Sequence, residues 1–443
     1  MQYVILGSGP AGISASEAIR SLDSRGEITL ITDDQDGYYS RPGLAYYLTG
    51  EIPEDGLYPF QAQDFKRLQI GMLKGKATRI QPEAHQVVLQ SGQAIYYDRL
   101  LVAIGAQAVT IQNPGAELQG VFKLDTLENA RQIVKMVRKG KAAVVIGGGI
   151  TALEIAEGLR ARGVRVHYFL RGDRYWANVL DEQESRIVEQ RLKEDGVQLH
   201  FETDLVEILG KGGKVIGVRT AAGEVVKCDM VGVAVGIKPR KELAQDSGIT
   251  VERGIVVDDR MGTSAPDVYA AGDVAEVRDR VTGRFTLRSL WTPARVQGTT
   301  AGMNMAGEKL HYTPGAPFNV TRLAGLTTTI IGEVGSQEVD KDVVGIVRGD
   351  SETWRQIPDA LVCQAGFAAN HLRLLVGEGT IVGGLVMGDQ KLSQAVHYLV
   401  ERQVDVTPIR DQLLRSKASP ADILASFWQK ITPTTKTQTP KAR

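Results

Sequence analysis

The sequence opens with MQYVILGSGPAGISASEAIR, residues 1–20. An apolar run at 3–6 leads into three spaced glycines, and a helical pattern follows. In such a loop the first glycine allows a tight turn, the second lets the backbone approach a pyrophosphate, and the third lets helix pack on strand. The diphosphate then lies at the positive end of the helix. The stretch therefore predicts a dinucleotide-binding loop, with candidate contacts at Gly7, Gly9, Pro10, Ala11 and Gly12.

The next predicted strand, residues 27–33, reads EITLITD and ends in an acid. Asp33 lies about 20 residues after the glycines, where a carboxylate can accept a hydrogen bond from a ribose hydroxyl. Three spaced glycines alone are weak evidence. Their position between a strand and a helix, with an acid at this distance, makes the prediction much more specific.

The same pattern returns in the middle of the chain. Residues 141–146, KAAVVI, predict a strand, 153–162 a helix and 164–169 the next strand. Between the first two lies GGGITA, with alanine as the permitted third position, and its candidate nucleotide contacts are Gly147, Gly149, Ile150 and Ala152. Two such units in one chain predict two bound dinucleotides, and hydride transfer between them is the expected use.

The second unit departs from the usual NAD pattern. The expected acid would fall near Leu170, and Arg171 and Arg174 follow instead. A missing acid removes a hydrogen bond worth ~1.5–3 kcal/mol to the ribose diol. It also removes the repulsion of a 2′-phosphate, which arginines favour. This pattern favours NADPH, although both arginines could be solvated loop residues and NADH stays open.

Composition limits the remaining possibilities. A chain of 443 residues exceeds one hydrophobic core and predicts two or three domains. The formal net charge is zero, which argues against a general nucleic-acid binder. The sequence has no apolar run of about 18 residues, so no membrane span is expected. The first predicted strand starts at Gln2 and leaves no room for a leader, so we expect a cytoplasmic protein.

The chain has two cysteines, Cys228 and Cys363, far apart in sequence. Without a CxxC or CxxxxC pair, a dithiol–disulfide relay within this chain is excluded. Two isolated structural thiols in a reducing compartment are the favoured interpretation.

Residues 263–275, TSAPDVYAAGDVA, closely resemble the second FAD signature of the two-dinucleotide-binding flavoprotein reductases. The resemblance implies that Gly272 and Asp273 meet the ribityl chain or pyrophosphate of FAD, and that the first loop holds FAD and the second the nicotinamide nucleotide. Residues 100–106 and 232–239 are similar to the family's strand ends between domains, and 76–80 to the strand that meets adenine. The contacts implied there are Ala77, Ala103, Gly105 and Gly236.

Residues 38–50, YYSRPGLAYYLTG, indicate the subclass. Pro42 stands where relatives that reduce CoA disulfide or oxygen carry a cysteine, so no sulfenate or mixed disulfide can form there. The pattern instead resembles the flavoproteins that reduce rubredoxin or ferredoxin and the flavin module of nitrite reductase. Arg41 could stabilise negative charge on the reduced flavin, contact a phosphate, or pair with a nearby acid.

Three further positions follow from the resemblance. Many relatives pair a lysine with a glutamate near the flavin; here Tyr46 takes the lysine position and Glu154 remains. Glu154 could then bond the nicotinamide amide, or be an exposed helix carboxylate. Residues 291–298 are similar to a helix start near the flavin ring, so Trp291 could stack there with Gln297 nearby, and a buried core tryptophan is the alternative.

The resemblance implies an α/β fold with two Rossmann-like domains and a C-terminal α+β domain. The expected parts are a discontinuous FAD domain at 1–110 and 236–315, an inserted NAD(P) domain at 111–235, a cap and homodimerisation domain at 316–415, and a short helix with a disordered tail at 416–443. Strands are predicted at 318–323, 327–331, 373–376 and 381–387, turns at Gly345, 377–379 and Gly384, and helices at 391–401, 406–414 and 416–430. For the low-complexity tail, a solvated segment without a role is favoured over a docking arm.

The function implied is hydride transfer from NAD(P)H to FAD, followed by electron transfer to an external carrier such as rubredoxin, ferredoxin or a metal centre of a partner subunit. An NAD(P)H oxidase or quinone reductase is one alternative, and a redox-sensing flavin-binding protein with incidental turnover is another. Hydride transfer needs alignment and exclusion of water more than acid–base side chains, so we expect no catalytic triad and no protein-bound metal.

Overall fold

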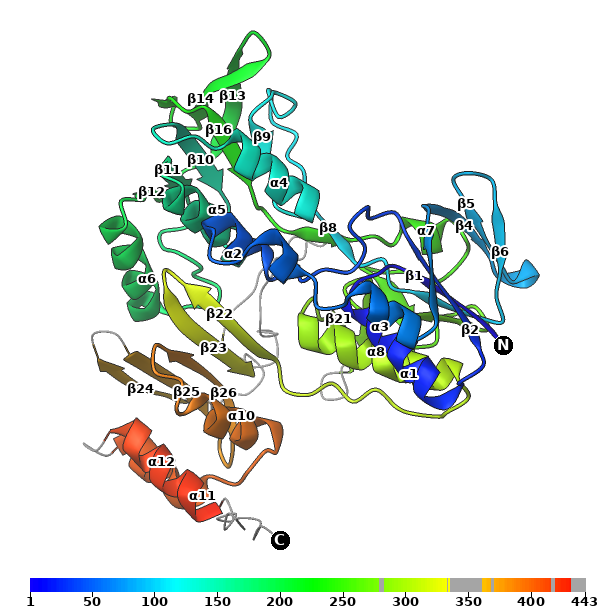
Figure 1. Cartoon of the computed structure of the whole chain (residues 1–443). Coiled ribbons are helices and arrows are strands. Elements are labelled where there is room, and N and C mark those ends of the chain that lie inside the picture. The colour runs from blue at the N-terminus through cyan, green and yellow to red at the C-terminus, as the bar shows by residue number, and fades with distance from the viewer. Residues whose placement is uncertain (279–282, 333, 335–360, 368–369, 416–418, 432–443) are drawn as a thin grey trace, which may run out of the picture. The chain divides into compact units, whose positions relative to one another are not determined.

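A computed structural model describes residues 1–278, 283–332, 334, 361–367, 370–415 and 419–431 (Figure 1). The chain divides into two compact units. The first contains residues 1–175 and 189–314, and the second contains residues 176–188 together with the described residues from Gly315 onward. In the described residues, no helix has the length and apolar character needed to cross a membrane.

The first sheet holds five parallel strands in the order β19-β7-β1-β2-β3. Ile5 at its centre faces Leu30 on one side and Leu101 on the other, and all three are fully buried. Strands covered on both faces read as continuous apolar runs, as these do. The strand bounds are β1 Gln2–Leu6, β2 Glu27–Thr32, β3 Ile70–Lys74, β7 Arg99–Val102 and β19 Val268–Ala270.

Two helices of small residues cover this sheet, α1 (Pro10–Leu22) and α8 (Trp291–Met305), and they lie side by side (Figure 1). A Cβ atom on Gly298 would lie 2.1 Å from the carbonyl oxygen of Ala11, and one on Gly302 would lie 2.5 Å from that of Ala15. Glycine at these two positions therefore lets the backbones approach to a distance that no side chain permits.

The second sheet also has five parallel strands, in the order β12-β11-β10-β16-β9. The predicted strands at 141–146 and 164–169 are confirmed, and the helix after the glycines begins at Ile150, three residues earlier than predicted. The bounds are β9 Val121–Phe122, α4 Leu127–Met136, β10 Ala142–Ile146, α5 Ile150–Ala161, β11 Arg165–Phe169, α6 Glu182–Glu194, β12 Gln198–His200 and β16 Met230–Val233. An antiparallel sheet packs its apolar residues against this one, with β13 Leu205–Lys211, β14 Lys214–Thr220 and β15 Val225–Val226.

The other elements of the first unit are short. The helices are α2 Leu44–Thr49, α3 Ala62–Arg67 and α7 Glu242–Gln245, with 3₁₀ turns at Glu54–Leu57 and Pro82–Ala84. The strands are β4 Ala77–Gln81, β5 Gln86–Leu89, β6 Ala94–Tyr96, β8 Ala106–Ala108, β17 Ile237–Pro239, β18 Ile255–Val257, β20 Ala275–Arg278 and β21 Phe285–Leu287.

The second unit is built on an antiparallel sheet in the order β22-β23-β26-β25-β24. The strands are β22 Phe318–Leu323, β23 Leu326–Gly332, β24 Leu361–Phe367, β25 Asn370–Val376 and β26 Ile381–Met387, followed by α10 Ser393–Glu401, α11 Thr407–Arg415 and α12 Pro420–Ile431. The predicted strands and helices are confirmed, with boundaries shifted by a few residues.

One predicted turn is wrong. Gly384 lies inside β26, where a Cβ atom would approach Val396 of α10 to 2.8 Å. The glycine marks a close approach of helix to sheet, which a strand glycine can also indicate. The predicted turn at Gly345 and the predicted tail at 432–443 lie outside the described residues.

Two histidines meet on neighbouring strands of the second sheet. Nδ1 of His167 on β11 lies 3.0 Å from Nε2 of His200 on β12, and the ring of His200 packs on Phe169. Burial lowers the pKa of both histidines, and in His167 the neighbouring His200 and Arg165 lower it further. The folded chain therefore favours the neutral pair.

We predict that replacing Gly298 with Ala lowers stability by about 1–3 kcal/mol, because the new Cβ must displace the backbone of α1. In an ordinary helix the same change would stabilise. Thermal unfolding and the FAD content of the purified protein measure the effect. Thr299→Ala, on an exposed position of the same helix, is the matched control. Equal unfolding temperatures for the two variants would contradict the packing described.

The histidine pair predicts an acid-sensitive stability. Because the folded pKa values lie below the unfolded value near 6.5, the pair contributes fully above about pH 6.5 and its contribution is lost as the pH falls through the folded pKa values. His200→Gln should therefore flatten the fall in unfolding temperature between about pH 7 and pH 5. A fall in His200→Gln as steep as that of wild type would contradict the neutral pair.

Candidate functional site

The first glycine loop joins β1 to α1. Gly7 has a φ of +106°, and a Cβ atom on it would lie 2.3 Å from the carbonyl oxygen of Ala103 at the end of β7. A Cβ on Gly12 would lie 2.1 Å from the carbonyl oxygen of Gly7. A Cβ on Gly9 would meet nothing within 4 Å. The first and third glycines thus close the turn, and the second faces the space that a pyrophosphate needs.

The second glycine loop joins β10 to α5 in the same way. Gly147 has a φ of +136°, and its Cβ would lie 2.1 Å from the carbonyl oxygen of Ala234 after β16. Gly148 and Gly149 face open space, while Ala152 is fully buried behind the loop. Both α1 and α5 have a glycine N-cap with no side-chain cap. Their first amide groups and the positive end of each helix can therefore serve a bound phosphate.

Ser8 fixes the shape of the first loop. Its hydroxyl lies 3.1 Å from the Thr32 hydroxyl at the end of β2 and donates to the carbonyl oxygen of Gly37 at 2.9 Å. Asp33 follows Thr32 directly and its side chain is exposed. The hydrogen bond between Ser8 and Thr32 therefore fixes the first glycine loop against the residue that precedes Asp33, the predicted ribose acid.

Gly272 and Asp273 follow β19 at the same edge of the first sheet. Gly272 has a φ of +81° and its amide donates to Oε1 of Gln297 at 2.8 Å, and Gln297 is fully buried in α8. Gln297 is expected near the flavin, which stays a prediction, and its side chain holds the Gly272 turn. Its Nε2 atom is buried without a hydrogen-bond partner in the described residues.

Arg41 lies in the 38–50 segment, which is predicted to lie beside the flavin, and it pairs with an acid from a distant part of the chain. Arg41 donates to Oδ1 of Asp125 at 3.3 Å, and Asp125 also accepts from the amide of Ala108 at 3.2 Å. Burial acts against the charged form of Arg41, but Tyr39, Asp125 and Asp273 outweigh it and raise its pKa above the ordinary value. Arg41 is therefore a permanent positive charge close to Asp273.

The indole ring of Trp291 stacks on Tyr38, with ring centroids 6.2 Å apart and planes inclined by 19°. Trp291 begins α8, as predicted, and it is only partly buried. The aromatic partner in the structure is therefore a residue of the 38–50 segment.

The other predicted contacts lie at sheet edges and loops. Gly105 has a φ of +68° with open space beside it, and Gly236 has a φ of +125°. Ala77 begins β4, partly exposed, and Pro42 is exposed. Glu154 is half-buried on α5, one helical turn before Gly158.

Position 170, directly after β11, carries no acid. Leu170 is buried after β11, and the Arg171 side chain is 78% exposed with Nε 4.0 Å from Asp204. Arg174 lies 3.3 Å from the neighbouring Asp173. Arg171 is therefore available to an anionic ligand.

Sequence reasoning missed the residues that hold the 34–58 segment. Arg131 of α4 donates to both oxygens of Asp36, at 2.7 and 2.9 Å, and to Glu54 at 2.6 Å. Arg162, just after α5, donates to the carbonyl oxygens of Leu48 and Tyr47 at the end of α2. These partners lie 77 to 115 residues apart, and no local pattern reveals such pairs.

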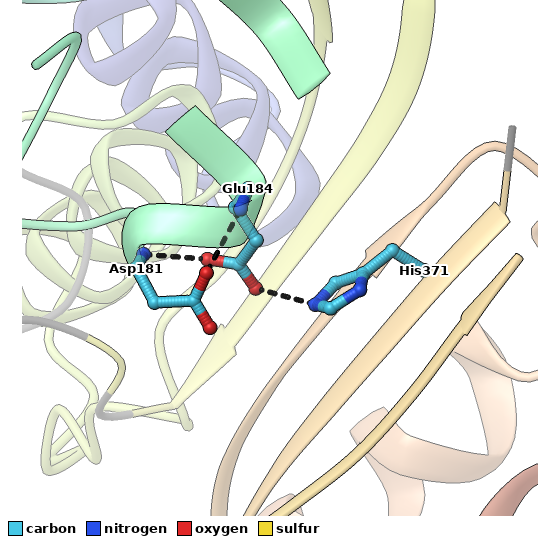
Figure 2. A group of neighbouring side chains, drawn as sticks. All are labelled: Asp181, Glu184 and His371. Atoms are coloured by element: carbon cyan, nitrogen blue, oxygen red, sulfur yellow. Dashed lines mark hydrogen bonds and ion pairs between the residues drawn. The ribbon is translucent and has the colours of Figure 1, made fainter. Parts of the chain in front are cut away.

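One group of described side chains has the composition of a metal site: Asp181, Glu184 and His371 (Figure 2). Nε2 of His371 lies 3.1 Å from Oε1 of Glu184, and Nε of Arg373 donates to the same oxygen at 2.8 Å. A divalent cation would meet the guanidinium charge at once, so the arrangement favours a buried ion pair over a metal.

The chain was compared with known proteins. The family model "Pyridine nucleotide-disulphide oxidoreductase" matches residues 1–298. The rubredoxin-NAD(+) reductase of Pseudomonas putida is 30% identical over 78% of this chain and 90% of its own length. The NADH oxidase of Methanocaldococcus jannaschii is 29% identical over 89% of each chain. A crystal structure of a ferredoxin reductase from Rhodopseudomonas palustris superposes with a TM-score of 0.80 at 25% identity, covering 92% and 96% of the two chains.

The matched residues include both glycine loops, the turn at Gly272 and the start of α8. On this match the chain belongs to the pyridine nucleotide-disulphide oxidoreductase family.

Proposed function

We propose that this chain takes a hydride from NAD(P)H onto a bound FAD and delivers the electrons to a small carrier protein. The observation that carries the proposal is the pair of glycine loops, each closed by a glycine against a neighbouring strand and open at its second glycine. The similarity to a rubredoxin reductase and a ferredoxin reductase supports the carrier as acceptor.

The residues present fit FAD at the first loop. We propose that FAD is held by the loop from Gly7 to Gly12, by Asp33 and Ala77 toward the adenosine, and by Ala103, Gly105, Gly272 and Asp273. When bound, FAD supplies the ability to accept two electrons together and release them singly. Gln297 contributes by holding the amide of Gly272 in place.

Arg41 is proposed to stabilise negative charge in this site. Its charge is held among Tyr39, Asp125 and Asp273 and is permanent at any physiological pH. Trp291 and Tyr38 form a stacked aromatic pair, which we propose lies beside the flavin ring. Glu154 is proposed to orient the nicotinamide amide, with Tyr46 where relatives place a lysine.

No thiol relay is proposed, despite the family name. Pro42 replaces the reactive cysteine of the thiol-using relatives. Cys228 is buried beneath the second sheet, and burial raises the pKa of its thiol to about 12. A thiol of that pKa is not a nucleophile near neutral pH. Neither cysteine has a partner at CxxC or CxxxxC spacing, and we therefore propose that the electrons leave to an acceptor outside the chain.

We propose NADPH over NADH at the second loop, where Gly147, Gly149, Ile150 and Ala152 would meet the diphosphate. Leu170 offers no carboxylate to repel a 2′-phosphate, and the exposed Arg171, with Arg174 beyond it, offers a positive charge. The family resemblance further suggests a homodimer formed through residues 316–415 and a cytoplasmic location. The domain boundaries, the dimer and the location stay predictions.

We predict that anaerobic addition of NADPH or NADH bleaches the flavin absorbance of the purified holoprotein. A screen of rubredoxin, ferredoxin, quinones and oxygen under steady NAD(P)H supply should then show fastest reoxidation by a one-electron carrier. Fastest reoxidation by air or quinones would favour an oxidase or quinone reductase. Very slow reduction with a stable charge-transfer band would favour a redox sensor, and no bleaching by either nucleotide would end the proposal.

We predict that Arg171→Ala lowers kcat/KM for NADPH about tenfold, the loss of roughly one charge-assisted hydrogen bond, and leaves NADH little changed. Steady-state kinetics with both nucleotides measure the ratio. Arg165→Ala, at the exposed opposite end of β11, is the matched control and should leave the ratio unchanged. An equal loss with NADPH and NADH would remove the argument for NADPH.

A further inference from the structure

The chain leaves the nucleotide-binding unit between Tyr175 and Glu189. Residues 176–188 belong to the compact unit of the C-terminal sheet, and the residues on both sides of them belong to the other unit. The segment follows within two residues of Arg174 and five of Arg171 in the sequence. Whatever fixes residues 176–188 therefore also fixes one end of the loop that carries both arginines.

The backbone at the start of this segment is constrained. Trp176 has a φ of +51°, which is uncommon for a large side chain, and it is almost completely buried. Its carbonyl oxygen accepts from the amides of Val179 and Leu180, both at 2.9 Å. A buried, left-handed tryptophan persists only where its surroundings determine it, so the segment has a defined shape.

Glu184 anchors the segment to β25. Its carboxylate is fully buried and Oε1 accepts from Nε of Arg373 at 2.8 Å, and Nε2 of His371 lies 3.1 Å away (Figure 2). Its Oε2 accepts from the amide of Asp181 at 2.9 Å, and the Glu184 amide donates to Oδ1 of Asp181 at 2.8 Å. This reciprocal pair is a capping box that begins α6.

Arg373 holds the rest of the segment. Its NH2 group donates to the carbonyl oxygen of Val179 at 2.8 Å and its NH1 group to that of Val334 at 3.1 Å, while its side chain is 8% exposed. One guanidinium therefore fixes the Val179 carbonyl before α6, the Glu184 carboxylate in the first turn of α6 and the Val334 carbonyl just after β23. A hydrophobic side chain could fill this space but could not fix three acceptors in direction.

The pair is charged at neutral pH. Burial alone would raise the pKa of Glu184, but the charge of Arg373 and the hydrogen bonds from His371 and the Asp181 amide outweigh it and hold the pKa below its ordinary value. Asp181 adds a second carboxylate 3.8 Å from Arg373. Nδ1 of His371 is buried with no hydrogen-bond partner in the described part of the chain.

We propose that Glu184 and Arg373 are positioning residues for the dinucleotide: by fixing residues 176–188, the C-terminal domain sets the shape of the 171–175 loop and thereby the affinity for NAD(P)H. This inference rests on the proposed function of the second glycine loop. It assigns the C-terminal domain a part in nucleotide binding through a loop in a different unit.

The test uses the FAD-loaded protein and the nucleotide that wild type prefers. Anaerobic stopped-flow reduction at increasing nucleotide concentration gives an apparent Kd and a limiting rate separately. Arg373→Met, which keeps the volume of the side chain, should raise the Kd about tenfold, equivalent to about 1.4 kcal/mol. The limiting rate and the FAD content should stay within about twofold of wild type, because neither residue touches the first loop.

A second variant and a matched control separate positioning from general loosening. Glu184→Gln keeps the shape of the side chain and removes its charge, so it should raise the Kd by a smaller factor and decides the matter if Arg373→Met does not fold. Arg410→Met removes another partly buried arginine of the same unit, which donates to the carbonyl oxygen of Gly377 at 2.9 Å. In the described part of the chain, Arg410 makes no hydrogen bond to residues 176–188. The control should bind nucleotide like wild type.

An unchanged Kd in the first two variants would overturn the inference, and so would an equal rise in Arg410→Met. A fall in the limiting rate with an unchanged Kd would also overturn it. Failure of wild type itself to bleach would instead overturn the proposed function, so the two failures are distinguishable.

Discussion

The structure depends on two places where a backbone touches a neighbouring strand because a side chain is missing. Gly7 faces the carbonyl oxygen of Ala103, and Gly147 faces that of Ala234, each at a distance that excludes a Cβ atom. This contact brings the end of β7 against the first glycine loop and the end of β16 against the second. It leaves the second glycine facing open space, so one steric constraint shapes both of the loops at which we propose that phosphate binds.

The two loops are not identical, and the difference has a physical reason. Gly12 cannot become alanine, because its Cβ would lie 2.1 Å from the carbonyl oxygen of Gly7. The equivalent position of the second loop holds alanine, and Ala152 is fully buried there. α1 also packs closely against α8 at Gly298 and Gly302.

The sequence predicted what local patterns encode and missed what distant pairs determine. Both glycine loops, their strands and four of the five strands of the antiparallel C-terminal sheet follow from spacing and alternation over about ten residues, whereas β24 was not predicted. The ties of Arg131 to Asp36 and of Arg162 to Leu48 join residues about 100 positions apart, and single charges carry no signal of their partners. Gly384 misled because a strand glycine at a helix contact and a turn glycine look alike in sequence. The role of Gln297 in holding Gly272 could not be predicted without the geometry of the turn.

These distant ties share a direction. Arg131 and Arg162 both reach from the second Rossmann unit to the 34–58 segment beside the predicted flavin, and a Cβ on Gly158 would meet Leu48 at 2.8 Å. Hydride transfer depends on alignment of two rings more than on acid–base groups. Arg131 and Arg162 lie outside both glycine loops. Within the first compact unit, they hold the 34–58 segment against the second Rossmann-like sheet and so bear on the alignment that hydride transfer needs.

The buried pair of Glu184 and Arg373 carries this argument one step further. Burying two charges costs desolvation energy that hydrophobic residues of the same size would avoid, so such a pair is weak evidence for stability. The guanidinium adds geometry, because it fixes three acceptors at once: the Glu184 carboxylate and the carbonyl oxygens of Val179 and Val334. A contact that costs energy and gives geometry is understandable beside the 171–175 loop, at which we propose that the nucleotide binds.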